Sequence, residues 1–232
     1  MKTHPFKHLQ LAISFYTRLP IVTNTLDYTQ LPQAAIYLPI VGWLVGGGAA
    51  LTFYMAATGG LHEDGFADVC DGFGGGYDKA RILAIMKDSH VGVYAVLGLL
   101  LLLALKISVL SNMPVTAVPW VLLAGHSVSR FAPLLLMHRY DYARAEDSKA
   151  SGAVYTPRMK ELLVAAGCAC LPLLLLPSLC LLAVIPVLMV NAGLGHYFYR
   201  HIGGYTGDCL GASQQIAEII FYLTVSSLWI FI

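Results

Sequence analysis

The residues with the clearest capacity for chemistry are the carboxylates of the glycine-rich run 59–77, which are Glu63, Asp64, Asp68 and Asp71. If this run is helical, Asp64, Asp68 and Asp71 stand at i, i+4 and i+7 and share one face. Like charges at that spacing repel one another, so the cluster is costly unless cations neutralise it. Oxygen-only ligands suit Mg²⁺, which commonly binds a few carboxylates together with substrate phosphates. We predict a Mg²⁺ site on these carboxylates. The alternative is a set of solvated acids facing water.

Four glycines follow the last carboxylate at Gly72, Gly74, Gly75 and Gly76. Glycines let backbone amides approach a phosphate closely, so we predict that they contribute to substrate binding. The same glycines could instead form a flexible turn or a close contact between helices. No G-x-x-x-x-G-K-[ST] sequence is present, and a P-loop nucleotide site is therefore not supported.

A second polar group, Lys87-Asp88-Ser89-His90, stands just before the next apolar segment. Asp88 could complete a two-metal site, and Lys87 or Arg81 could pair with a phosphate. We predict that Asp88 is a metal ligand and that Lys87 contacts the substrate.

Two further candidates lie later in the chain. Arg130 sits inside an apolar segment, where an ionisable residue is a functional candidate unless it serves as a structural partner for one of the acids. Asp208 lies between glycines at the start of the last apolar segment and suggests a contact with metal or substrate, whereas the glycines alone would be read as packing positions. His62, beside the acid cluster, is a candidate for mutation.

The elements that must position these residues are set by composition. Hydrophobic residues make up 57% of the 232-residue chain and charged residues 12%, against about 25% charged in a soluble domain. Lipid is therefore the main solvent, and spanning segments in lipid must be helical because no alternating barrel pattern is present. We predict one domain over residues 1–232, an all-α transmembrane bundle of about six or seven membrane helices. The net charge of +1 and the absence of a basic block argue against nucleic acid as a partner.

Apolar runs mark the expected spans. They cover 32–57, 91–110, 115–137, 162–198 with a break at Pro177 and Ser178, and 216–232. An even number of crossings before Lys79 would need a further helix over 63–72. Basic residues concentrate in the connections near the acids, so the positive-inside rule puts that side in the cytoplasm. We expect the bacterial cytoplasmic (inner) membrane, with the acidic site at its cytoplasmic edge. Gly42 and Gly46 could support a homo-oligomer.

Taken together, these motifs resemble the cobalamin synthase family, also called adenosylcobinamide-GDP ribazoletransferase. The most specific segment is Gly60-Leu-His-Glu-Asp-Gly-Phe-Ala-Asp-Val-Cys-Asp-Gly-Phe-Gly-Gly75. Shorter matches run in order along the chain: Phe15-Tyr-Thr-Arg-Leu-Pro20, Pro39-Ile-Val-Gly42, Ile85-Met-Lys-Asp-Ser89, Ser129-Arg130 and Gly203-Gly-Tyr-Thr-Gly-Asp208. These segments contain the residues predicted to bind substrate, which are Gly72, Gly74, Gly75, Lys87, Ser89, Arg130, Thr206 and Asp208.

The resemblance implies a phosphotransferase reaction. A hydroxyl group of the nucleoside α-ribazole, or of its 5′-phosphate, attacks the cobinamide-linked phosphorus of adenosylcobinamide-GDP, and GMP leaves. We predict catalytic roles for Glu63, Asp64, Asp68 and Asp71, with metal held by Asp64, Asp68, Asp71 and Asp88. A carboxylate not engaged by metal, Glu63 or Asp71, could accept the hydroxyl proton.

Two alternatives come from other classes of protein. A CDP-alcohol phosphatidyltransferase uses D-x-x-D-G-x-x-A-R followed by G-x-x-x-D-x-x-x-D, and only its opening matches here, at Asp68, Asp71 and Gly72. A cation transporter could use carboxylates within the membrane, but these acids cluster in one run and no internal repeat is visible.

Overall fold

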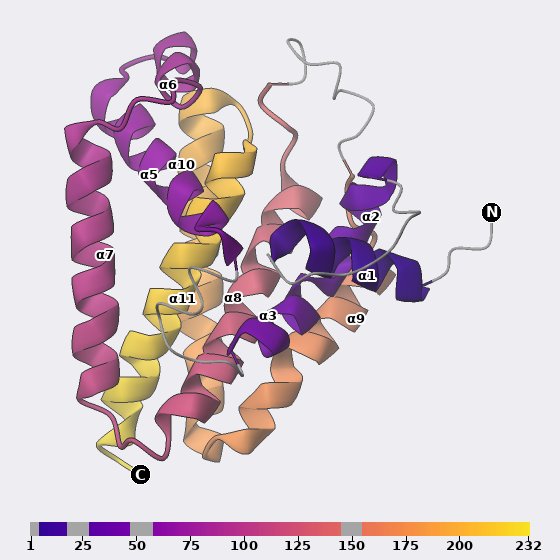
Figure 1. Ribbon diagram of the computed structural model, residues 1–232, viewed down its shortest axis with the longest axis vertical. Coiled ribbons are helices and arrows are strands. Elements are labelled where there is room, and N and C mark those ends of the chain that lie inside the picture. Colours follow the sequence, from indigo (N-terminus) through magenta and orange to yellow (C-terminus); the bar gives the residue numbers. More distant parts are fainter. Residues whose placement is uncertain (1–4, 18–27, 47–57, 145–154) are drawn as a thin grey trace.

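The computed structural model describes residues 5–17, 28–46, 58–144 and 155–232, and over these residues it is an all-helical bundle (Figure 1). No strand forms in this part of the chain; one isolated bridge joins Tyr142 to Tyr205. The α-helices are α1 (Pro5–Tyr16), α2 (Leu31–Ala34), α3 (Leu38–Gly46), α5 (Leu61–Gly75), α6 (Lys79–Ile85), α7 (Val93–Ser111), α8 (Val118–Arg139), α9 (Met159–Cys170), α10 (Val184–Ile202) and α11 (Gly207–Trp229). Short 3₁₀ helices are η1 (Tyr28–Gln30), η2 (Ala35–Tyr37), η3 (Leu171–Leu175) and η4 (Ser178–Ala183).

Three helical segments are long and apolar enough to cross a membrane. They are Val93–Ser111, Val118–Arg139 and Ser178–Ile202. At about 1.5 Å per residue, even the shortest spans roughly the 30 Å hydrocarbon core of a bilayer. The sequence predicted all three, including the break at Pro177. Their outward faces carry exposed apolar side chains, such as Leu100 and Leu101 on α7 and Met189 on α10, as a lipid-facing surface requires.

Other expected boundaries differ from the structure. Helix α11 begins at Gly207 rather than Ile216, because the side chain of Thr206 accepts a hydrogen bond from the Cys209 amide (3.3 Å) and caps the helix in a polar stretch. A helix does form over the acidic run, but α5 is only 15 residues long, which is short for a crossing. Of the first expected span, residues 47–57 lie outside the described part.

The helices from α7 to α11 alternate in direction, so their connections fall towards two ends of the bundle, whereas α1 and α3 lie across it (Figure 1). The turn between α7 and α8 and the C-terminus lie at one end. Helix α6, the start of α7 and the connection between α10 and α11 lie at the other. The basic residues of α6 and of the segment after it therefore share one end with the last turn of α10, which carries Arg200.

Helix α8 forms the centre of the bundle. Its buried residues include Val121, Ala124 and Val128 on one side and Leu134 on another, and they join two apolar clusters packed against α7, α9, α10 and α11. Helix α3 lies directly on α8, since a Cβ atom built on Gly42 would stand only 2.2 Å from the carbonyl oxygen of His126. Gly42 thus serves packing within the chain, and its predicted role in self-association stays a prediction.

Candidate active site

The acidic run forms α5, and the helix places its carboxylates at the predicted spacing. Asp64 lies in the first turn, with Asp68 and Asp71 one and two turns further on. The helix begins after Gly60, whose φ of 74° is the left-handed conformation that glycine adopts without strain. The predicted shared face is therefore confirmed at the level of the backbone.

A fourth carboxylate, Asp208, joins this face from α11. Helices α5 and α11 approach closely at two glycines: a Cβ on Gly65 would lie 3.0 Å from the carbonyl oxygen of Asp208, and one on Gly211 would lie 3.2 Å from that of His62. Burial, together with the charges of Asp208 and Asp64, raises the pKa of Asp68 to about 6. The site therefore disfavours an uncompensated negative charge and fits a cation.

Arg144 is a member of this site that the sequence did not single out. Its Nη2 atom donates to Oδ2 of Asp208 at 3.2 Å, and both side chains keep about a quarter of their surface exposed. In the sequence Arg144 is one basic residue among several in a charged connection, with no motif around it. Only the fold brings this connection to the start of α11, where the Tyr205 amide donates to the carbonyl oxygen of Asp141 at 3.0 Å.

The carboxylate of Asp71 is held by the start of α7. One oxygen accepts from the amide of Gly92 at 2.6 Å and the other from the amide of Ala95 at 2.9 Å. These are amides that the first turn of a helix leaves unpaired, so Asp71 caps α7 from a neighbouring helix. Its catalytic and metal-binding roles stay predictions. In either role, the oxygens of Asp71 would also have to accept the two hydrogen bonds that cap α7.

The second polar group faces solvent at the connection between α6 and α7. Asp88 is more than half exposed and hydrogen-bonds to the ring and amide of His90. Lys87 and Ser89 are also exposed. The roles of Asp88 as a metal ligand and of Lys87 and Ser89 in substrate binding are untested by this geometry.

The predicted glycine loop is the last part of α5. A Cβ on Gly72 would stand 2.4 Å from the side chain of Met86, and one on Gly74 would stand 2.6 Å from the ring of Tyr94. Close packing against α6 and α7 therefore accounts for both glycines, which was the alternative left open by the sequence. For Gly72, Gly74 and Gly75, contact with a substrate phosphate stays a prediction.

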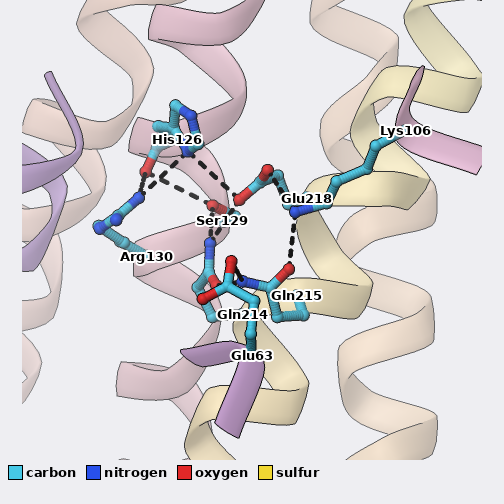
Figure 2. Close-up of polar contacts among 8 residues, drawn as sticks. All are labelled: Glu63, Lys106, His126, Ser129, Arg130, Gln214, Gln215 and Glu218. Atoms are coloured by element: carbon cyan, nitrogen blue, oxygen red, sulfur yellow. Dashed lines mark hydrogen bonds and ion pairs between the residues drawn. The ribbon is translucent and has the colours of Figure 1, made fainter. Parts of the chain in front are cut away.

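A network of buried polar side chains connects α5, α7, α8 and α11 inside the bundle (Figure 2). Lys106 of α7 donates to Glu218 (2.7 Å) and to Gln215 (2.6 Å) of α11, and Gln215 donates to Glu63 of α5 (2.9 Å). Gln214 donates to the other oxygen of Glu218 at 2.7 Å. These residues are almost fully buried, so the charges are paired as an apolar surrounding requires.

Arg130 and His126 belong to this network through α8. Nη1 of Arg130 donates to the carbonyl oxygen of His126 at 3.1 Å, and Nδ1 of His126 lies 3.2 Å from Glu218. Arg130 is completely buried, which favours the structural interpretation of this residue over direct contact with substrate. Lys106 and Gln215 were not predicted, because hydropathy does not show which polar residues of an apolar helix face inward.

Comparison with known proteins identifies the chain. The family model described as cobalamin-5-phosphate synthase matches residues 8–226. Curated relatives named adenosylcobinamide-GDP ribazoletransferase include that of Shewanella amazonensis (39% identical, covering 94% of each chain) and that of Ralstonia pickettii (35%, covering 91% of this chain and 92% of the relative). The chain belongs to the cobalamin-5-phosphate synthase family. No solved structure matches it.

Membership of the cobalamin-5-phosphate synthase family agrees with the resemblance read from the sequence, and it covers every residue of the candidate site. A third relative of the same name, from Leptospira interrogans, is 35% identical over 93% of both chains. These matches run nearly end to end, so they do not favour the lipid phosphatidyltransferase or the transporter as alternatives.

Proposed function

We propose that this chain joins adenosylcobinamide-GDP with α-ribazole, or with its 5′-phosphate, to give adenosylcobalamin, or its 5′-phosphate, and GMP. The observation that carries the proposal is the meeting of Asp64 and Asp68 on α5 with Asp208 on α11, in a family whose curated relatives are named for this transfer. Phosphoryl transfer depends mainly on positioning and on electrostatic stabilisation, and charged groups on two packed helices can supply both.

The bonds changed in the reaction are few. A hydroxyl oxygen of the nucleoside forms a bond to the phosphorus that carries cobinamide, and the bond from this phosphorus to the oxygen of GMP breaks. The hydroxyl proton passes to a carboxylate. Of the two acceptors predicted from the sequence, we assign this role to Glu63, because both oxygens of Asp71 already accept from backbone amides of α7. One oxygen of Glu63 accepts from Gln215, and the other has no hydrogen-bond partner among the described residues.

The carboxylates fit Mg²⁺ by their chemistry. No three His, Cys, Asp or Glu side chains in the described ranges are arranged to hold an ion by themselves. Mg²⁺ does not need such a cage, because it usually binds one or two carboxylates and completes its shell with water and substrate phosphates. Asp64, Asp68 and Asp208 would provide the carboxylates. When bound, the ion would neutralise the pyrophosphate.

Arg144 adds a positive charge on the substrate side of the site. Its guanidinium contacts Asp208 through one nitrogen only and is partly exposed, so its remaining donors can reach a phosphate oxygen. Planar guanidinium groups bind phosphates through two parallel hydrogen bonds. We therefore assign Arg144 to binding of the pyrophosphate, beside the carboxylates.

The membrane arrangement is part of the proposal. Three candidate spans agree with a membrane-bound enzyme. We propose about six or seven crossings in the bacterial cytoplasmic membrane, with the acidic site at the cytoplasmic edge, because the basic connections lie at the end of the bundle that holds α6.

The test is GMP release by the purified protein in detergent, given both substrates with and without Mg²⁺. We expect Asp64→Asn to lower kcat at least roughly hundredfold, the scale for losing one group that stabilises transition-state charge. Glu161→Gln is the matched control, since it removes a carboxylate charge from α9 while its side chain can still accept from the Arg158 amide. Full activity of Asp64→Asn, or no release by the wild type, would refute the proposal.

A further inference from the structure

A cavity of about 390 Å³ opens beside the acidic site, between α1, the segment 31–38, the start of α5, the end of α8 and the start of α11. Its wall combines aliphatic side chains with five aromatic ones, which come from segments far apart in the sequence: Phe15, Tyr16, Tyr142, Tyr155 and Tyr205. Two of them, Tyr142 and Tyr205, meet edge to face with ring centroids 5.6 Å apart. Such a wall suits a flat, largely apolar ligand.

The wall also includes two carboxylates of the candidate site. Asp64 and Asp208 both line the cavity. A ligand bound there can place an aromatic ring against the apolar part of the wall and a second group at the carboxylates proposed for phosphoryl transfer. This geometry is what an acceptor nucleoside needs, because its base must be held while a ribose hydroxyl reaches the phosphorus.

His62 also lines the cavity, but only 6% of its surface is exposed. Its Nε2 atom is buried and has no hydrogen-bond partner within the described residues, so this nitrogen lies behind the wall and not on the cavity surface. The cavity wall that a ligand meets is therefore formed by the aromatic and aliphatic side chains together with Asp64 and Asp208.

This inference rests on the proposed reaction, whose substrates differ in size and polarity. A volume of 390 Å³ is near the lower end for small-molecule pockets, which suits a nucleoside and excludes a corrin ring with its side chains. Guanine carries several donors and acceptors on its edge, which a mostly apolar wall would leave unpaired. The base of α-ribazole is a benzimidazole, two fused rings with few polar atoms. We propose that this cavity binds the benzimidazole base of the acceptor nucleoside, with the ribose directed to Asp64 and Asp208.

The main test separates the two substrates kinetically. Phe15 is 45% exposed, so Phe15→Ala can remove an aromatic wall without opening the core. We expect the KM for α-ribazole to rise about fivefold or more, on the scale of losing one stacking contact, and to rise by more than kcat falls. The KM for adenosylcobinamide-GDP and inhibition by GMP should stay unchanged. Phe231→Ala, an exposed phenylalanine at the C-terminal end, is the matched control.

A second variant fills the cavity instead of enlarging it. Leu61 lines the cavity and is 41% exposed, so Leu61→Trp adds bulk without entering the core. We expect weaker binding of α-ribazole, measured by equilibrium dialysis against the detergent-solubilised protein, and no change for Leu174→Trp on the outer surface of η3.

The outcomes are separable from those of the proposed function. If the wild type releases GMP but both cavity variants keep a normal KM for α-ribazole, the reaction stands and the cavity assignment fails. If the variants change the KM for adenosylcobinamide-GDP instead, the cavity holds the other substrate and the assignment is wrong. If the wild type binds α-ribazole and loses it in Leu61→Trp but releases no GMP, the cavity assignment stands and the proposed reaction fails.

Discussion

At the scale of single residues, the four acids of the central run have different surroundings despite their regular spacing. Asp64 faces the cavity, Asp68 lies among other carboxylates, and Asp71 is bound by two backbone amides of α7. Glu63 points into the buried network and accepts from Gln215. Position along a helix face therefore does not by itself assign a role in catalysis.

For Asp71, this difference predicts a structural effect that exceeds the catalytic one. Asp71→Asn keeps one acceptor oxygen but loses the charge that favours a helix N-terminus, so the free energy of unfolding should fall by about 1 kcal/mol. Turnover should stay within about threefold of the wild type, because the remaining cap keeps α7 in place. Thermal unfolding in detergent and GMP release under saturating substrates measure the two effects. A loss of a hundredfold in turnover at an unchanged melting temperature would instead make Asp71 the proton acceptor.

The acids could be predicted as a group because charge is scarce in this chain. Arg144 could not, since a basic residue in a charged connection is the ordinary case and only the contact with Asp208 distinguishes it. The same holds for Lys106: an isolated lysine in an apolar run can extend to the membrane surface or turn inward, and composition does not separate the two.

At the scale of helices, the site depends on the contact between α5 and α11. Glycines at their crossing let the backbones touch, and the buried network ties both helices to α7 through Lys106. The network therefore holds the helix that carries Asp64 against the helix that carries Asp208. Its pairs are buried, so removing one partner leaves a charge without compensation.

This arrangement predicts a strong coupling between Lys106 and Glu218. Lys106→Met or Glu218→Gln alone should lower stability by about 3–5 kcal/mol, the usual cost of leaving a buried charge unpaired. The double variant should recover much of that loss, because neither charge of the pair then remains without its partner. Unfolding of the four proteins in the same detergent, treated as a double-mutant cycle, gives the coupling energy. Additive losses would show that the two side chains do not depend on each other.

Predicting the helices succeeded where apolar length decides the outcome and failed where local capping decides it. Helices α7 and α8 and the break at Pro177 follow from hydropathy and proline, which act within a short window. The start of α11 does not, because Thr206 caps a polar turn that hydropathy assigns to a loop. The cavity was not predicted at all, since its wall combines α1, α5, α8 and α11.

At the scale of the whole molecule, the two ends of the bundle differ in charge. The connection between α7 and α8 is short and uncharged. Nine of the 14 lysines and arginines instead lie between α5 and α7, from the last residue of α8 to the first turn of α9, or near the end of α10. The start of α11, with Asp208, lies at the charged end (Figure 1). In the orientation that we propose from the positive-inside rule, water-soluble substrates of the cytoplasm would reach the carboxylates directly.

Labelling of single cysteines can test this orientation. In a variant whose native cysteines are replaced by alanine, Lys87→Cys and Arg158→Cys at the charged end should react with a membrane-impermeant maleimide only after the cells are permeabilised. Asn112→Cys and Ser178→Cys, at the opposite end, should react in intact cells. All four positions are exposed, so accessibility alone does not distinguish them. Positions 87 and 112 flank α7, and equal reactivity of the two would show that α7 does not cross the membrane. The reverse pattern would place the carboxylates outside the cytoplasm, and a source of adenosylcobinamide-GDP on that side would then be required.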